Sequence, residues 1–201
     1  MKRVGVLVSG RGSNLQALVD AARRGQLGGE IAVVVSNVEG ALGLDRARRA
    51  GVPAVFRDHR GKDREAFDAE VLEILRAHHV DLVCLAGFMR LLSPVFVRAF
   101  PGRIVNIHPA LLPAFPGLDA QRQAWEHGAK VSGATVHLVD EGLDSGPIVA
   151  QEAVVVLSSD TPESLAARIL EAEHRLYPKA VRLLLESRCR VEGRRVIVEG
   201  E

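Results

Sequence analysis

Asn106 and His108 stand two residues apart in the segment RIVNIHPALLP, residues 103–113. The apolar residues around them are typical of a buried strand, and side chains two apart on a strand point to the same face. Pro109 then ends the strand. An amide and an imidazole side by side can both donate hydrogen bonds to an oxygen that gains negative charge. We therefore expect an oxyanion site at this strand end; the alternative for His108 is a histidine that only supports the structure.

Asp144 could complete such a site. It lies in the segment DEGLDSGP, residues 140–147, together with Asp140 and Glu141. The simplest interpretation is an exposed acidic turn. The functional alternative is that Asp144 folds over His108, because a carboxylate within about 4–6 Å favours the charged imidazolium. A charged imidazole then donates a stronger hydrogen bond to a developing oxyanion.

A glycine-rich loop, SGRGSN at residues 9–14, precedes the first predicted helix. Gly10 and Gly12 allow a tight turn, while Gly12, Ser13 and Asn14 present backbone N–H groups at the start of the helix. Those groups and the helix dipole favour an anion, so the loop is suited to a phosphate. The alternative is a plain turn in which Ser13 or Asn14 caps the helix.

Dinucleotide binding is a weak interpretation of this loop. Leu15 occupies the position of the third glycine in GxGxxG, and the second predicted strand ends in Asn37 instead of an acid that could bind a ribose. No Gly-Lys-Ser/Thr follows, so the loop is not a P-loop either.

Strand-like and helical patterns alternate through the first half of the chain. Gly25 and Gly51 lie where two of the helices should end. Continuous apolar runs indicate strands that are covered on both faces, as in a parallel sheet. The predicted strands are 3–9, 30–37, 53–58 and 81–87, and the predicted helices that follow them are 14–25, 42–51, 63–79 and 94–100.

The predicted fold class is therefore α/β, with a Rossmann-like, mostly parallel sheet and helices on both faces. In such a sheet the ligand crevice lies at the carboxyl ends of the strands. Asn106 and His108 lie at one such end, and the segment LAGFMRLL, residues 85–92, brings Met89 and Arg90 to the same rim. The alternatives are core packing for Met89 and a solvated cation for Arg90.

The second half of the chain has a different character. Three prolines make residues 109–117 a loop. Residues 130–159 predict two longer, antiparallel strands joined by a glycine-containing turn. Thr161 is suited to cap the long amphipathic helix that follows, in which Pro178 could introduce a kink. Residues 189–200 predict a small hairpin.

Composition limits the classes of protein. The chain has 201 residues, and its 26 basic and 25 acidic side chains give a net charge of +1, which argues against a nucleic-acid partner. We expect a single domain over 1–201. Cys84 and Cys189 lack CxxC spacing, which favours a reducing, cytoplasmic location. No apolar run reaches the ~18 residues of a membrane span. His78 and His79 lack a third ligand, so we expect no metal.

Seven motifs follow one another along the chain: SGRGSNLQAL (9–18), DREAFD (63–68), LAGFMRLLSP (85–94), NIHPALLP (106–113), PG (116–117), GATVHLVDEGLDSGPI (133–148) and EHRLYP (173–178). In order and spacing they resemble the phosphoribosylglycinamide formyltransferase family, the folate-dependent enzymes of purine synthesis. The resemblance covers nearly the entire chain. NIHP with the later GxTVHxVxxxxDxGPI pattern is specific to folate-dependent formyl transfer, and SGxGSN narrows it to the glycinamide ribonucleotide branch.

The resemblance implies formyl transfer from 10-formyltetrahydrofolate to the amine of 5-phosphoribosylglycinamide. It implies a ribonucleotide phosphate loop in the N-terminal half, and folate and catalytic loops in the C-terminal half. For Arg64 and Glu173 the alternative is an ordinary charge on a helix surface. The implied catalytic residues are Asn106, His108 and Asp144; those for the ribonucleotide phosphate are Gly12, Ser13 and Asn14; Glu173 is implied for the ribonucleotide; and those for folate are Arg64, Met89, Arg90, Leu91, Leu92, Asn106, Asp140, Glu141, Gly142, Leu143 and Asp144.

Some positions depart from the family pattern. Leu170 stands where some members carry Gln, Ala114 where Lys is found, and Asp119 and Gln121 where some relatives have His. These departures concern ribose and amide recognition, not the catalytic trio. The rival functions are another folate-dependent formyl transferase, a formyltetrahydrofolate hydrolase and a non-catalytic nucleotide-phosphate sensor. The expected assembly is a monomer or a homodimer.

Overall fold

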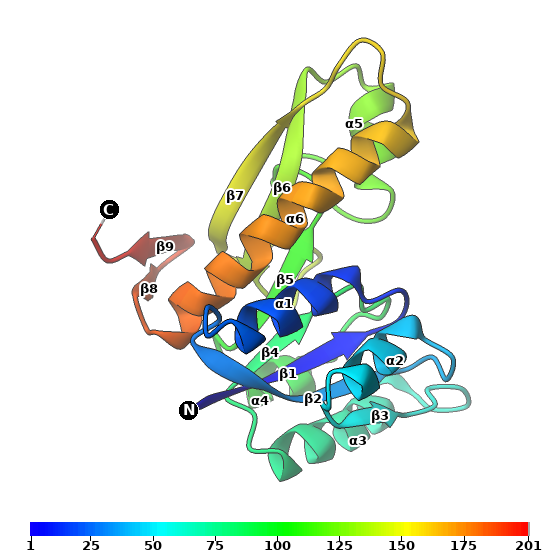
Figure 1. The fold of residues 1–201 in the computed structure, drawn as a ribbon, viewed down its shortest axis with the longest axis vertical. Coiled ribbons are helices and arrows are strands. Elements are labelled where there is room, and N and C mark those ends of the chain that lie inside the picture. Colours follow the sequence, from blue (N-terminus) through cyan, green and yellow to red (C-terminus); the bar gives the residue numbers. More distant parts are fainter. Residues whose placement is uncertain (201) are drawn as a thin grey trace.

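The computed structural model describes residues 1–200, so the last residue of the predicted domain lies outside the described part. Within it, nine strands form one sheet in the order β3-β2-β1-β4-β5-β6-β7-β9-β8 (Figure 1). The strands are β1 (Lys2–Val8), β2 (Gly29–Ser36), β3 (Ala54–Phe56), β4 (Leu82–Leu85), β5 (Ile104–His108), β6 (Val131–Leu138), β7 (Ile148–Val155), β8 (Cys189–Glu192) and β9 (Arg195–Val198), and the helices are α1 (Ser13–Arg23), α2 (Leu42–Arg49), α3 (Arg64–Ala77), α4 (Pro94–Ala99), α5 (Ala120–Glu126) and α6 (Pro162–Leu185).

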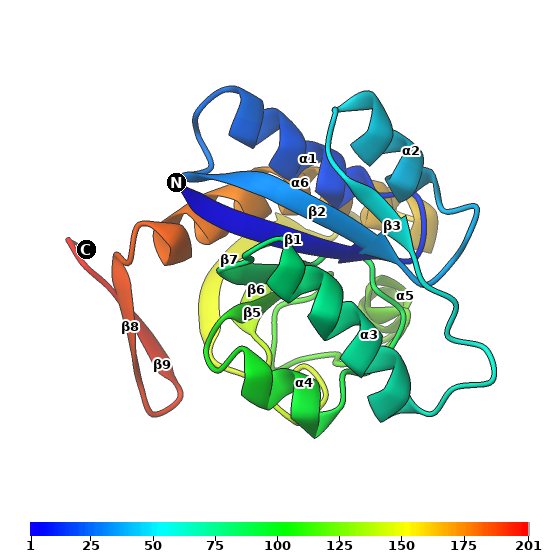
Figure 2. The same cartoon turned by 90° about the horizontal axis from the view of Figure 1, so that it is seen from below.

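The predicted fold class is confirmed. Strands β1 to β5 pair in parallel, β5 pairs with β6 and β6 with β7 in the antiparallel sense, and β8 and β9 form the predicted hairpin. Helices α1, α2 and α6 cover one face of the sheet, while α3 and α4 cover the other (Figure 2). The central strands are buried on both faces, which is why they are continuously apolar.

The helix ends follow local chemistry. Gly25 and Gly51 take positive φ just after α1 and α2, as expected for helix-ending glycines. The interpretation that Ser13 or Asn14 caps α1 is wrong: the cap is Gly12, in the left-handed conformation and without a side-chain hydrogen bond. Thr161 caps α6 as predicted, forming a reciprocal pair of hydrogen bonds with Ser164.

Two features of the helices differ from or refine the expectations. Helix α6 runs without interruption past Pro178. Helix α5 was not predicted. It has only seven residues, with too few apolar positions for a clear helical period, and it is preceded by Asp119, which adopts the left-handed conformation.

A buried tyrosine contacts two neighbouring strands. The hydroxyl of Tyr177, on α6, lies 2.8 Å from the carbonyl oxygen of Leu85 and 3.0 Å from that of Val105. These residues belong to the neighbouring strands β4 and β5. The contact therefore fixes the sheet directly beside Asn106.

The backbone of α2 lies against the glycine-rich loop. Gly12 has a φ of +70°, and a Cβ atom there would lie 2.6 Å from the Cα of Gly43. Gly25 has nearly the same φ, +69°, but nothing within 4 Å of such an atom. Replacing each glycine by alanine therefore distinguishes two destabilising effects. At Gly25 only the left-handed conformation is unfavourable, whereas at Gly12 the new Cβ atom also clashes with the backbone of Gly43.

We predict that Gly25→Ala lowers the free energy of unfolding by about 1–2 kcal/mol, the usual cost of a left-handed alanine. Gly12→Ala should cost clearly more, because the backbone of Gly43 must also move. Urea denaturation of both variants measures the difference. Equal losses would mean that the loop and α2 are not rigidly packed.

Candidate active site

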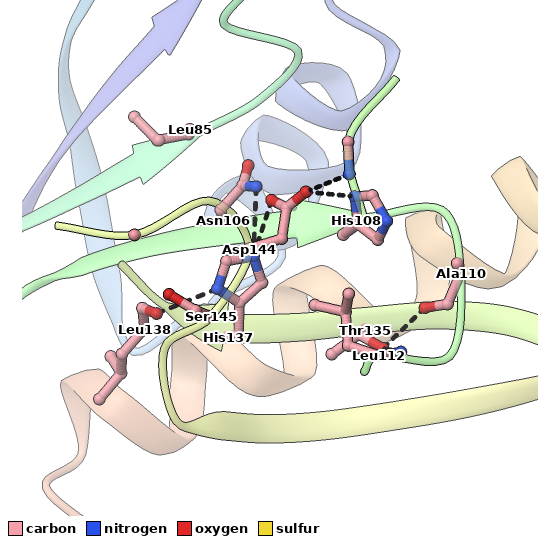
Figure 3. A network of polar contacts seen from close by, with 12 residues as sticks. Leu85, Asn106, His108, Ala110, Leu112, Thr135, His137, Leu138, Asp144 and Ser145 are labelled. Atoms are coloured by element: carbon pink, nitrogen blue, oxygen red, sulfur yellow. Dashed lines mark hydrogen bonds and ion pairs between the residues drawn. The ribbon is translucent and has the colours of Figure 1, made fainter. Parts of the chain in front are cut away.

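The catalytic trio predicted from the sequence meets at the carboxyl end of β5 (Figure 3). The Nδ1 atom of His108 lies 3.4 Å from the Oδ2 atom of Asp144, which reaches it from the loop between β6 and β7. His108 is only 4% exposed. Asn106 is half-buried on the same face of the strand. An amide, an imidazole and a carboxylate therefore share one small, largely dry space.

The carboxylate of Asp144 is held by several donors. The backbone N–H of Gly117 donates to its Oδ2 atom at 2.8 Å, and the Nε2 atom of His137 lies 3.6 Å from its Oδ1 atom. Burial raises the pKa of Asp144, but the hydrogen bonds from His137 and Gly117 and the charges of His108 and His137 outweigh burial and hold the pKa below its ordinary value. Asp144 is therefore a buried anion at neutral pH.

Both ring nitrogens of His108 face acceptors. The Nε2 atom lies 2.8 Å from the carbonyl oxygen of Phe115, and Nδ1 faces Asp144. Only an imidazolium, which carries a hydrogen on each ring nitrogen, donates to both of these acceptors. The 3.4 Å contact of Nδ1 with Asp144 is longer than the 2.8 Å contact of Nε2 with Phe115, so the ring is held more firmly on its Nε2 side.

His137 belongs to the same network but was not singled out from the sequence. It pairs with Asn106 across β5 and β6, and its Nε2 atom lies 3.3 Å from the Nδ2 atom of Asn106. Its Nδ1 atom faces the carbonyl oxygen of Leu138 at 3.0 Å, so Nδ1 carries a hydrogen. The Nε2 side of the His137 ring therefore faces both the carboxylate of Asp144 and the amide of Asn106. The feature that reveals His137 is the antiparallel pairing of β5 and β6, which places it opposite Asn106.

The glycine-rich loop adjoins a buried acid. Glu173, on α6, is 6% exposed, so its interpretation as an ordinary surface charge is wrong. Burial raises its pKa to about 7, and a hydrogen bond with Asn14 opposes that rise. The Oδ1 atom of Asn14 is buried without a partner. A groove of about 400 Å³ adjoins Ser13 and is lined also by Arg46. The start of α1 and a cation therefore face this groove.

The residues implied for folate are less uniform. Met89 and Leu91 are 70% and 55% exposed, so core packing is the wrong interpretation for Met89. Arg90 is not a freely solvated cation, because its guanidinium lies 4.9 Å from the centre of the Phe67 ring. Arg64 begins α3 and is exposed.

The loop between β6 and β7 holds the rest of the folate set. Asp140 accepts hydrogen bonds from Gly142 N–H at 3.0 Å and from the hydroxyl of Ser145 at 2.7 Å, so it shapes the loop. Glu141 pairs with Arg98 at its outer side. Leu143 is 57% exposed. The loop thus presents an apolar side chain next to Asp144.

No group of three or more His, Cys, Asp or Glu suited to a metal ion occurs among residues 1–200. None of the helices in this part of the chain is both long and apolar enough to cross a membrane.

We predict that the ionisation of Glu173 lowers the free energy of unfolding as the pH rises. A raised pKa means that the folded state is stabilised below about pH 4.5 and loses that contribution as the pH rises through about 7. Glu173→Gln does not titrate, so it should gain stability relative to the unaltered protein across this range, by at most on the order of 3 kcal/mol. Thermal unfolding from pH 5 to 8 measures this; Glu171→Gln, an exposed position on the same helix, is the control. If the difference in stability between Glu173→Gln and the unaltered protein stays constant from pH 5 to 8, the prediction is contradicted.

Comparison with known proteins agrees with this geometry. The model of the Formyl transferase family matches residues 2–181. The phosphoribosylglycinamide formyltransferase of Escherichia coli is 41% identical over 197 residues, which are 98% of this chain and 93% of that protein. The trifunctional purine biosynthetic protein adenosine-3 of Drosophila melanogaster is 53% identical over 187 residues, which are 92% of this chain. The match spans only 14% of that longer protein.

A solved structure is also similar over almost its whole length. Glycinamide ribonucleotide transformylase 1 from Symbiobacterium toebii superposes with a TM-score of 0.97 at 57% sequence identity, covering 99% of this chain and 94% of that one. With the family model and these relatives in agreement, the chain belongs to the formyl transferase family.

Proposed function

We propose that this protein transfers the formyl group of 10-formyltetrahydrofolate to the amine of 5-phosphoribosylglycinamide, giving N-formylglycinamide ribonucleotide and tetrahydrofolate. The observation that carries the proposal is the meeting of Asn106, His108 and Asp144 at the end of β5. The chain works as one formyltransferase unit with two small-molecule substrates, in the cytoplasm, as a monomer or homodimer. The proposed reaction requires no metal, nucleic acid or membrane.

The main physical problem of the reaction is the oxyanion. The substrate amine, with a pKa near 8, is already about one tenth neutral at pH 7. When it attacks the formyl carbon, the carbonyl oxygen becomes an anion on a tetrahedral carbon. Asn106 donates to this oxygen through an amide N–H, and His108 donates through its imidazolium. Donors of this kind, fixed before the reaction, contribute about 10²–10³ each in rate.

Asp144 has two tasks in this scheme. As a buried anion it keeps His108 charged and turned toward the cleft. It also accepts the proton that the amine loses, through a water molecule, and passes it to the departing folate nitrogen as the bond from that nitrogen to the formyl carbon breaks. Atoms and charge then balance without another reactant.

Binding at two remote anchors orients the reacting groups. The backbone N–H groups of Gly12, Ser13 and Asn14 hold the phosphate at the start of α1. Glu173 and the unpaired Asn14 oxygen face the ribonucleotide beside it. The folate lies against the exposed apolar side chains of Met89, Leu91 and Leu143. Fixing both substrates in one cleft supplies much of the acceleration.

Mixing the purified protein with both substrates tests the function. We expect N-formylglycinamide ribonucleotide to accumulate in equal amount to the 10-formyltetrahydrofolate consumed, as measured by chromatography with mass detection. Formate released without the ribonucleotide would identify a hydrolase. Tight binding of the ribonucleotide with no product would identify a sensor. Either result overturns the proposal.

His108→Ala separates catalysis from binding. The variant loses an oxyanion donor and the partner of Asp144, so kcat should fall by at least about 10²–10³. The phosphate anchor is untouched, so calorimetry should give a dissociation constant for 5-phosphoribosylglycinamide within about threefold of the unaltered protein. His79→Asn, at an exposed left-handed position outside the site, is the control. A loss of binding as large as the loss of turnover would contradict the assigned role.

A further inference from the structure

In the segment Met89–Leu92 two side chains are exposed, Arg90 and Leu92 are half-buried, and the backbone is held by hydrogen bonds. It links β4 to α4 without forming regular structure. Met89 and Leu91 are 70% and 55% exposed, so they contribute little packing that would hold the segment in place. Leu92 packs against the core, and the hydrogen bonds that hold the segment lie at its two ends.

The first end is held by Ser9, the residue that opens the glycine-rich loop. Its hydroxyl oxygen accepts a hydrogen bond from the backbone N–H of Met89 at 2.9 Å. The same hydroxyl donates to the Oδ1 atom of Asn37 at 2.5 Å. The backbone N–H of Ser9 donates to the carbonyl oxygen of Gly87 at 3.0 Å. One residue thus joins the ends of β1 and β2 to the start of the segment.

Asn37 is only 6% exposed and is itself fixed. Its Nδ2 atom lies 3.4 Å from the Nδ1 atom of His59, and its carbonyl oxygen lies 3.1 Å from the same nitrogen. This explains why an amide ends the second strand, at a position where a dinucleotide-binding protein would carry an acid. The side chain of Asn37 is turned toward Ser9 and is committed to the protein.

Helix α3 holds the segment from its other side. The carboxylate of Asp68, which is 2% exposed, accepts a hydrogen bond from the backbone N–H of Ser93 at 2.6 Å. Arg90 lies over the ring of Phe67, and the ring of His59 meets the same phenyl ring edge-on at 6.2 Å. These contacts connect the segment to α3 and, through His59 and Asn37, back to Ser9. The hydroxyl of Ser9 joins this network to the glycine-rich loop.

We propose that Ser9 is a positioning residue for the folate: its hydroxyl lets the loop that binds the ribonucleotide phosphate also fix the Met89–Leu92 wall. The inference rests on the proposed function, because it takes this wall as part of the folate site. Alanine at position 9 would leave the N–H of Met89 and the Oδ1 atom of Asn37 unpaired. Water or a shifted backbone would then satisfy them, and the wall would no longer match the folate.

The test is a set of steady-state KM values for each substrate in Ser9→Ala, Ser9→Thr and Ser158→Ala. One lost hydrogen bond, about 1 kcal/mol, corresponds to about fivefold in binding. We expect Ser9→Ala to raise the KM for 10-formyltetrahydrofolate about five- to tenfold and to leave the KM for 5-phosphoribosylglycinamide within about twofold. Ser9→Thr keeps the hydroxyl and should restore the folate KM. Ser158 is exposed and distant in sequence from both loops, so its variant is the control.

The two KM values discriminate between positioning and simple damage. A partly unfolded preparation lowers the apparent kcat but leaves both KM values unchanged. A rise in the folate KM alone therefore cannot result from a loss of active protein. An unchanged folate KM in Ser9→Ala overturns the inference. Both KM values rising together also overturn it, because Ser9 would then only support the glycine-rich loop.

A second measurement separates this inference from the proposed function. Calorimetric titration with tetrahydrofolate needs no turnover, and the dissociation constant should rise about five- to tenfold in Ser9→Ala. If the unaltered protein makes no formyl product, the proposed function is wrong. The titration still shows whether Ser9 affects the binding of tetrahydrofolate. Equal affinities in the two proteins, or no affinity in either, overturn the inference.

Discussion

The site depends on keeping one partly buried carboxylate charged. Burial alone opposes the ionised form of Asp144, yet the N–H of Gly117 and the rings of His108 and His137 more than compensate for it. Each of these partners comes from a different segment of the chain. The loop after β5, the loop after β6 and the two paired strands must therefore all be in place before the charge is stable, which links the chemistry of the site to the fold.

The architecture meets this requirement by joining two kinds of sheet. Parallel strands bring the glycine-rich loop, the Met89–Leu92 segment and the end of β5 to one edge. The switch to antiparallel pairing at β6 then sets His137 opposite Asn106. The hydroxyl of Tyr177 joins β4 and β5 through the carbonyl oxygens of Leu85 and Val105. A wholly parallel sheet would provide the edge but not the second histidine.

Features fixed by local sequence were predictable, and those fixed by strand register or helix packing were not. Continuous apolar runs predicted the central strands, and family motifs pointed to the trio. His137 escaped notice because its role depends on which residue faces it across β5 and β6. The burial of Glu173 depends on α1 packing against α6. The pairing of Ser9 with Asn37 joins residues 28 apart in the chain and leaves no local pattern.

The geometry of His108 also constrains how the site can act. Its Nε2 atom is committed to the carbonyl of Phe115 at 2.8 Å, whereas the contact of Nδ1 with Asp144 is 3.4 Å long. In the proposed reaction, the oxyanion competes with Asp144 for the hydrogen on Nδ1, where the ring makes its longer contact. The carboxylate then loses little, because the N–H of Gly117 still donates to it. The hydrogen bond to Phe115 keeps the ring in its orientation throughout, so little reorganisation is needed as charge develops on the substrate.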